Sequence, residues 1–121
     1  MSAFTLLTIG ALGGMGAVGR FLVDGIIAAR LGREFPFGTL AVNLTGTLAL
    51  GILLGAAVSD DALRLLGTGL LGSYTTFSTW ALESHRLGED GERAAGVLNF
   101  VASLALGVAV AWTAQEIGAA L

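Results

Sequence analysis

Four long apolar stretches constrain the fold of this 121-residue sequence more than any other feature. A helix needs about 20 residues to cross the roughly 30 Å hydrocarbon core of a membrane. The stretches run over about residues 3–29, 37–58, 62–82 and 94–118, and short connections join them, the last a polar segment over 83–93. We therefore predict an all-α integral membrane protein, with a single four-span membrane domain over residues 1–121.

Composition supports a membrane protein and excludes several functions. Only 12% of the residues are charged and 55% are hydrophobic, whereas a soluble domain averages about 25% charged residues. The absence of cysteine excludes disulfides and zinc–thiolate sites, and a single histidine argues against a metal enzyme. The sequence offers no pairing of a nucleophile with a base and no basic run that would bind nucleic acid. We therefore expect neither an enzyme nor a nucleic-acid partner.

Small residues recur at a spacing of four within the apolar stretches. They are Gly10, Gly14, Gly51, Gly55, Ser103, Gly107 and Ala111. Small side chains let transmembrane helices approach closely, so the spacing predicts tight helix packing. Because four helices enclose little volume, we also expect a pore or carrier of this size to dimerise.

The arginines indicate an orientation in the membrane. The loops after the first and third spans carry Arg30, Arg33, Arg86 and Arg93, whereas the opposite side carries Arg64 alone. The positive-inside rule places the arginine-rich loops in the cytoplasm and both termini outside. Because the charges are few, insertion in both orientations stays open.

The second span contains a polar stripe of Thr39, Asn43 and Thr47. A spacing of four places these side chains on one helix face. The amide of Asn43 offers two N–H donors and an acceptor, and its burial without partners would cost several kcal/mol. Two interpretations stay open: an interhelical hydrogen bond, worth about 0.6–2 kcal/mol, or a polar pathway.

The third span is interrupted by residues that form helix poorly. Residues 73–79 contain five serines and threonines and follow the glycines at 69 and 72. We predict a broken helix, which is tolerated at membrane depth only inside protein or beside a water-filled cavity. The freed carbonyls either hold a small cation, as in other broken spans, or the Ser and Thr hydroxyls satisfy the kink.

Two opposite charges lie near the end of the first span. Arg20 and Asp24 are four residues apart, so they can pair on one helix face. Arg20 either reaches toward the lipid headgroups or forms an electropositive vestibule that concentrates anions.

Together these segments resemble the Fluc (CrcB) family of fluoride channels. The family's first-span motif is similar to residues 13–20, Gly-Gly-Met-Gly-Ala-Val-Gly-Arg. Its second-span motif is similar to residues 36–43, Pro-Phe-Gly-Thr-Leu-Ala-Val-Asn, together with Gly46. Residues 75–79, Thr-Thr-Phe-Ser-Thr, resemble the third-span signature, and residues 99–107 resemble the fourth span. The resemblance covers all four spans in order.

The resemblance implies a channel that exports fluoride by passive conduction across the cell (plasma) membrane. It further implies an antiparallel dimer with two fluoride pathways and a structural sodium ion at the dimer interface. The expected partners are fluoride, membrane lipid and either a second copy of the chain or a homologous subunit of opposite topology. Whether one chain inserts in both orientations stays open.

The family's functional positions map onto particular residues of this chain. The sodium ligands fall on the main-chain carbonyls of Gly72 and Thr75, and the pore asparagine falls on Asn43. The aromatic pair falls on Phe77 and Trp80, the second of which replaces the usual phenylalanine. The remaining expected positions are Thr39, Ser78, Thr79 and Ser103 in the pathway and Arg20 in the vestibule.

Physical chemistry makes these assignments reasonable. Fluoride is strongly hydrated, so a dry pore must replace its water with donors such as the amide of Asn43 and the positive edges of aromatic rings. None of these groups carries a full charge, which allows the ion to leave as well as enter. The indole of Trp80 is larger than a phenyl ring and adds an N–H donor. It could assist the anion, narrow the pore or mark an altered pathway.

Two other classes of membrane protein stay open as alternatives. A dual-topology, proton-coupled multidrug exporter has a similar length and four spans, but it needs a carboxylate within the membrane. No glutamate lies at the centre of any predicted span. The second alternative is a membrane subunit with a structural or regulatory role and no transport activity.

Overall fold

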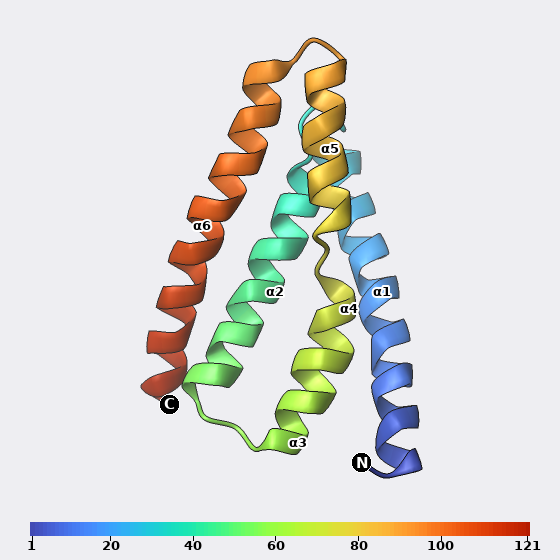
Figure 1. Ribbon diagram of the computed structural model, residues 1–121, viewed down its shortest axis with the longest axis vertical. Helices are drawn as coiled ribbons and strands as arrows, with labels where there is room; N and C mark the ends of the chain where they lie inside the picture. Colours follow the sequence, from blue (N-terminus) through green and yellow to red (C-terminus); the bar gives the residue numbers. More distant parts are fainter.

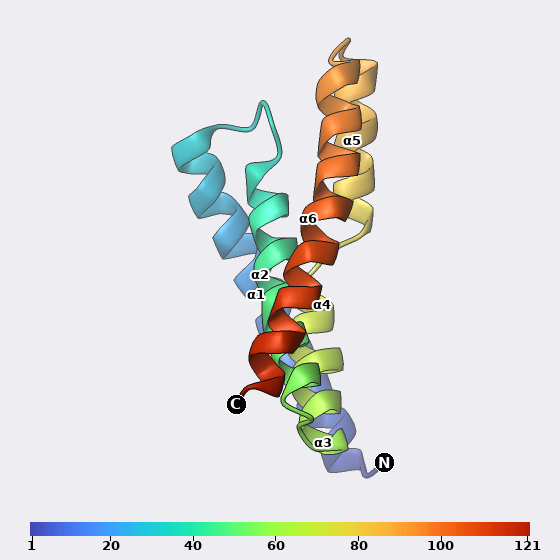
Figure 2. The same ribbon diagram turned by 90° about the vertical axis from the view of Figure 1, so that its left-hand side faces the viewer.

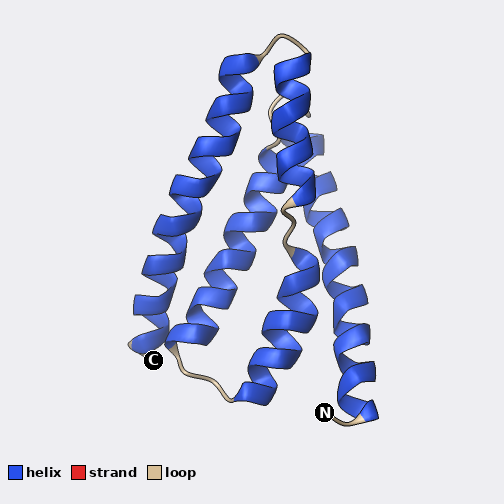
Figure 3. Ribbon diagram, viewed as in Figure 1, coloured by secondary structure: helices blue, strands red, loops and turns tan.

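The computed structural model describes residues 1–121 and contains helices and loops with no strands (Figures 1 and 3). Three helices are long and apolar enough to span a membrane individually, and the third span is assembled from shorter pieces. The elements in order are α1 (Ala3–Leu31), α2 (Phe37–Gly55), α3 (Asp60–Ala62), η1 (Leu63–Leu71, π-helical), α4 (Gly72–Tyr74), α5 (Ser78–Glu89) and α6 (Arg93–Ala119). The predicted all-α fold with a broken third helix is confirmed.

The spans run up and down, so both termini lie at the same end of the molecule as the turn from α2 to α3 (Figure 1). The loops after α1 and α5 lie at the opposite end. Turning the molecule shows α1 and the α5–α6 pair spreading apart toward that end (Figure 2). The four arginines used for the orientation argument therefore lie on or beside one end of the bundle, as predicted.

The polar segment over residues 83–93 is mostly helical, which differs from the predicted connection. The helix α5 continues to Glu89, and only Asp90–Glu92 separate it from α6. The exposed pair of His85 and Glu89 supports this extension, with Nε2 2.8 Å from Oε1 one turn along the helix. Gly91 adopts a φ of 84° in the turn, a conformation that glycine takes without steric cost.

Close packing explains some of the regularly spaced small residues. A Cβ on Gly51 would collide with Ala114 of α6, and one on Gly55 would collide with the backbone of Gln115. By contrast, a Cβ on Gly10, Gly14 or Gly107 would meet open space. The prediction of tight packing is thus correct for α2 against α6 and wrong, within one chain, for these other three glycines. Gly10 and Gly14 are exposed on α1, and Gly107 lines the cavity described below.

The outer surface of the bundle is apolar. Phe4, Phe21, Val108 and Trp112 are each at least 70% exposed, whereas Val42 and Ala114 are fully buried. Exposed apolar surface on this scale marks contact with lipid or with another protein. The buried interior is narrow, so the site described below lies between helices that also face the membrane.

Replacing Gly51 by alanine should separate α2 from α6. We expect Gly51→Ala to lower the free energy of unfolding by about 1–3 kcal/mol, the usual cost of overpacking. Gly25→Ala is the matched control because its Cβ meets open space within a helix, where alanine is favoured by roughly 0.5–1 kcal/mol. Thermal unfolding of the detergent-solubilised protein measures both, and equal stabilities of the two variants would contradict this packing.

Candidate ion pathway at the broken third span

The third span breaks at Thr75–Phe77, between α4 and α5. The N–H of Thr75 makes the last helical bond, 3.0 Å from the carbonyl of Leu71, and its hydroxyl donates to the same carbonyl. Beyond this point Thr75 is extended, with φ −79° and ψ 161°. The hydroxyl of Thr76 accepts the N–H of Thr79 and so caps the start of α5. The Thr75 and Thr76 hydroxyls thus provide hydrogen bonds to some of the backbone groups at the break, as one of the two interpretations expected.

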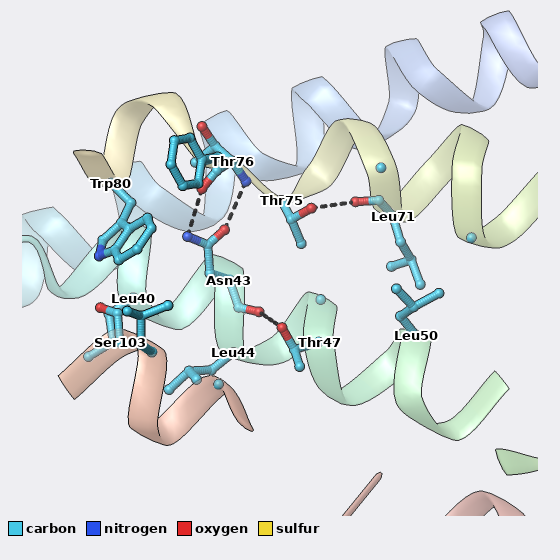
Figure 4. A pocket seen from close by; sticks show the side chains of 16 residues that line it. Leu40, Asn43, Leu44, Thr47, Leu50, Leu71, Thr75, Thr76, Trp80 and Ser103 are labelled. Atoms are coloured by element: carbon cyan, nitrogen blue, oxygen red, sulfur yellow. Dashed lines mark hydrogen bonds between the residues drawn. The ribbon is translucent and has the colours of Figure 1, made fainter. Parts of the chain in front are cut away.

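The side chain of Asn43 pairs with the backbone at the break. Its Nδ2 donates to the carbonyl of Thr76, and the N–H of Thr76 donates to Oδ1, both over 2.8 Å (Figure 4). The interhelical hydrogen bond left open by the sequence is therefore present. One Nδ2–H remains without a protein acceptor, so Asn43 can still donate to a ligand.

A cavity of about 320 Å³ adjoins this pair, between α2, the third span and α6 (Figure 4). The predicted site residues on its wall are Asn43, Gly72, Thr75, Phe77, Trp80 and Ser103. Leucines of α2, η1 and α6, three glycines, and the threonines at 47 and 76 complete the lining, and no charged side chain contributes to it. The cavity is therefore apolar with a few polar groups, an arrangement typical of a binding or conduction site.

The two aromatic residues meet edge to face on one side of the cavity. The ring centroids of Phe77 and Trp80 lie 5.2 Å apart with an interplanar angle of 76°. Trp80 is 7% exposed and Phe77 is 72% exposed. The expected shared face is therefore present, but the indole is buried and the phenyl ring is not.

The other predicted pathway residues do not line this cavity. Thr39, Thr79 and Arg20 line a second cavity of about 360 Å³ between α1, α2 and α5. Thr76 lines both cavities and so lies at the boundary between them. Ser78 is exposed and lines neither.

The predicted pair of Arg20 and Asp24 does not form. Nη1 of Arg20 lies 3.5 Å from the carbonyl of Thr75 at the break, while Asp24 pairs with Arg33 of the following loop, Oδ2 to Nη1 3.5 Å. The loop brings Arg33 to Asp24, which leaves Arg20 directed at the break rather than toward lipid headgroups. A positive charge at this carbonyl favours anions nearby.

Sequence reasoning missed three residues of the site. Glu83 accepts a short hydrogen bond from the hydroxyl of Thr39, Asn99 is 2% exposed on α6, and Thr76 joins the cavities. Glu83 lies just beyond the third apolar stretch, which ends at residue 82. Asn99 lies within the fourth apolar stretch, and the sequence does not reveal its hydrogen-bond partners. The spacing of Glu83, three residues after Trp80 on the same helix, was the available signal.

The carbonyls of Gly72 and Thr75 fit a hard cation. In a continuous helix the N–H of Thr76 would bond the Gly72 carbonyl, but here it bonds Asn43. The Thr75 carbonyl receives only the long contact from Arg20. No group of three or more acidic or histidine residues offers an alternative metal site. Main-chain oxygens of this kind suit sodium and similar ions.

A helical membrane protein with a broken span beside an uncharged, mostly apolar cavity belongs to the broad class of channels and carriers. Residues 7–115 match the model of one such family, described as CrcB-like protein, Camphor Resistance (CrcB). The chain belongs to this family, and to the plasma-membrane, multi-pass proteins that make it up.

Curated relatives extend along nearly the whole chain. A Mycobacterium tuberculosis protein named fluoride-specific ion channel FluC 2 is 50% identical over 125 residues, covering 95% of this chain and 99% of the relative. FluC 1 of Rubrobacter xylanophilus is 54% identical over 99 residues, covering 81% of this chain and 80% of the relative. FluC of Geobacter sulfurreducens is 43% identical over 113 residues, covering 89% of this chain and 91% of the relative. The family consists of ion channels, not enzymes.

Removing the Asn43 side chain should destabilise the break. We expect Asn43→Ala to lower the free energy of unfolding by about 1–3 kcal/mol, because the peptide groups of Thr76 lose their partners. Amide hydrogen exchange at Thr76 should accelerate. Thr47→Ala is the control, because its hydroxyl bonds only the preceding turn of α2. Unchanged exchange at Thr76 in Asn43→Ala would contradict the pairing.

Proposed function

We propose that this chain forms a fluoride-selective channel through which fluoride leaves the cell by passive conduction. The observation that carries the proposal is the uncharged cavity at the break, which combines the free Nδ2–H of Asn43 with an aromatic pair. Membership in a family whose relatives are named fluoride-specific ion channels supports the same ion. Neither the multidrug exporter nor the non-transporting subunit gains support from these relatives.

The cavity offers hydrogen-bond donors to a small anion without binding it too tightly for release. Asn43 supplies an N–H, Ser103 a hydroxyl, and Phe77 the positive edge of an exposed ring. A full positive charge on the wall would hold fluoride tightly and slow its release, whereas neutral donors replace water and still let the ion go. Selectivity over chloride then follows from the small number of donors and the absence of a wide aqueous bore.

The second cavity is suited to the role of vestibule. Arg20 supplies positive charge there, and the acid on the same wall, Asp24, is paired with Arg33. Thr79 supplies a hydroxyl, while the hydroxyl of Thr39 is donated to Glu83. Such a site raises the local concentration of anions before they enter the narrow part. Thr76 lies between the two cavities, so the proposed route passes this residue, with Ser78 at its exposed edge.

The functional unit in this proposal is an antiparallel dimer with two pathways. Phe77 is 72% exposed in one chain, so the wall of the cavity is incomplete without a partner. Gly10 and Gly14 present a smooth face on α1 with nothing packed against it, where a second helix can approach closely. The partner is either a second copy or a homologous subunit of opposite topology.

A sodium ion at the dimer centre completes the proposal. The carbonyls of Gly72 and Thr75 from each subunit would hold it. When bound, the ion supplies positive charge that offsets carbonyl dipoles freed by the break. The contact from Arg20 to Thr75 means that this guanidinium shares the carbonyl's environment with the proposed ion.

Fluoride selectivity is the first test. Liposomes containing the purified protein should release fluoride rapidly and chloride barely, as ion-selective electrodes measure. Asn43→Asp should abolish fluoride release, because a carboxylate replaces N–H donors with negative charge in a poorly screened path. Size-exclusion profiles check that this variant still folds. Equal fluoride and chloride release by the parent protein would refute the proposed function.

Sodium removal is the second test. Replacing sodium by the bulky cation N-methyl-D-glucamine should lower the thermal stability of the dimer and promote its dissociation, because a bound ion stabilises by mass action. Light scattering and thermal unfolding measure both effects, with the total ionic strength held constant as the control. A dimer with the same stability in both salts would contradict a structural sodium ion.

A further inference from the structure

The side chain of Trp80 is held against α6 by a ring contact and a hydrogen bond. Its indole stacks on Phe100 of α6, with ring centroids 4.5 Å apart and an interplanar angle of 15°. Its Nε1 donates to the main-chain carbonyl of Asn99 over 3.3 Å, in a buried position. The indole N–H therefore points to α6, while another part of the residue lines the cavity.

Two further hydrogen bonds connect α5 and α6 around this indole. Nδ2 of Asn99 donates to the hydroxyl of Ser84 over 2.8 Å, and that hydroxyl donates to the carbonyl of Trp80 over 2.9 Å. Together with the indole bond they form a closed ring of three residues, which we call the Trp80 latch. Asn99 is 2% exposed and the indole bond is buried, so this bond is shielded from competing water and gains strength, whereas the two bonds of Ser84 are partly buried.

The latch separates a strong donor from the ion. An indole N–H facing the cavity would add one more donor to those of Asn43 and Ser103, and each further donor binds fluoride more tightly and slows its release. Engaged with the Asn99 carbonyl, it is unavailable, and the indole contributes ring carbons alone. Phe77, which is 72% exposed and meets Trp80 edge to face, is then the adaptable member of the aromatic pair.

We propose that Ser84 and Asn99 are positioning residues that keep the indole N–H of Trp80 out of the fluoride pathway. The proposal rests on the proposed function of the channel. It also selects among the roles that the sequence left open for Trp80: the ring forms a fixed wall, and its N–H does not assist the anion. The need for such a latch arises because the indole of tryptophan carries an N–H, which a phenylalanine at this position would lack.

The test compares Ser84→Val with Ser84→Thr in a Trp112→Phe background. The chain contains two tryptophans, and Trp112 is exposed on α6, so this background leaves Trp80 as the sole indole probe. Threonine retains the hydroxyl that valine lacks at nearly the same shape, which makes the pair matched. Ser84→Ala serves in place of Ser84→Val if the branched side chain prevents folding. Ultraviolet resonance Raman spectra report the hydrogen bond of the indole N–H, and liposome assays report fluoride flux per folded dimer.

With Ser84→Val we expect a weaker indole hydrogen bond, a fluoride-dependent change in Trp80 emission, and fluoride flux reduced about three- to tenfold, corresponding to the loss of one buried hydrogen bond. Ser84→Thr should retain the parental spectrum and flux. Adding Trp80→Phe to Ser84→Val should restore flux, because phenylalanine has no N–H to expose. A general packing defect would not be rescued in this way.

Two results would overturn the proposal. One is an indole spectrum and a flux that are the same in Ser84→Val and Ser84→Thr. The other is a reduced flux in Ser84→Val that Trp80→Phe fails to restore. If the parent protein conducts no fluoride, the proposed function fails by itself, and the Raman comparison still decides whether the hydroxyl of Ser84 holds the indole.

Discussion

The pairing of Asn43 with the peptide groups of Thr76 is the interaction on which the site depends. A break in a membrane helix leaves polar backbone groups that water cannot reach, at a cost of several kcal/mol each. A single amide on α2 satisfies a donor and an acceptor at once. By taking the N–H of Thr76, it also frees the carbonyl of Gly72. The cavity, the aromatic pair and the candidate cation ligands all follow from this break.

The sequence was sufficient to predict the fold and the location of the break. Four apolar stretches determine the spans, and the cluster of serines and threonines after Gly72 cannot continue a helix at membrane depth. It was also sufficient to group Asn43, Phe77, Trp80 and Ser103, which line one cavity. The roles proposed for these residues stay predictions.

The remaining features depend on contacts that periodicity does not encode. Arg20 and Asp24 have the spacing of a helical pair, yet the loop brings Arg33 to Asp24 and leaves Arg20 at the break. The indole N–H of Trp80 could face an ion or a neighbouring helix, and only the structure shows its partner on α6. Likewise, hydropathy placed residues 83–89 in a connection, but tertiary contact with Thr39 and α6 accompanies a continuation of the helix.

In the proposed mechanism, fluoride passes the break by accepting a hydrogen bond from the remaining Nδ2–H of Asn43. The most direct test is the dipolar coupling between ¹⁹F of bound fluoride and ¹⁵N in the asparagine side chains, measured by solid-state NMR on the protein in lipid. Asn43→Ser assigns the signal, because Asn43 and Asn99 are the only asparagines in the chain. A coupling that places fluoride within hydrogen-bond distance of Asn43, and disappears in Asn43→Ser, is the predicted result. Bound fluoride without coupling to Asn43 would contradict this mechanism.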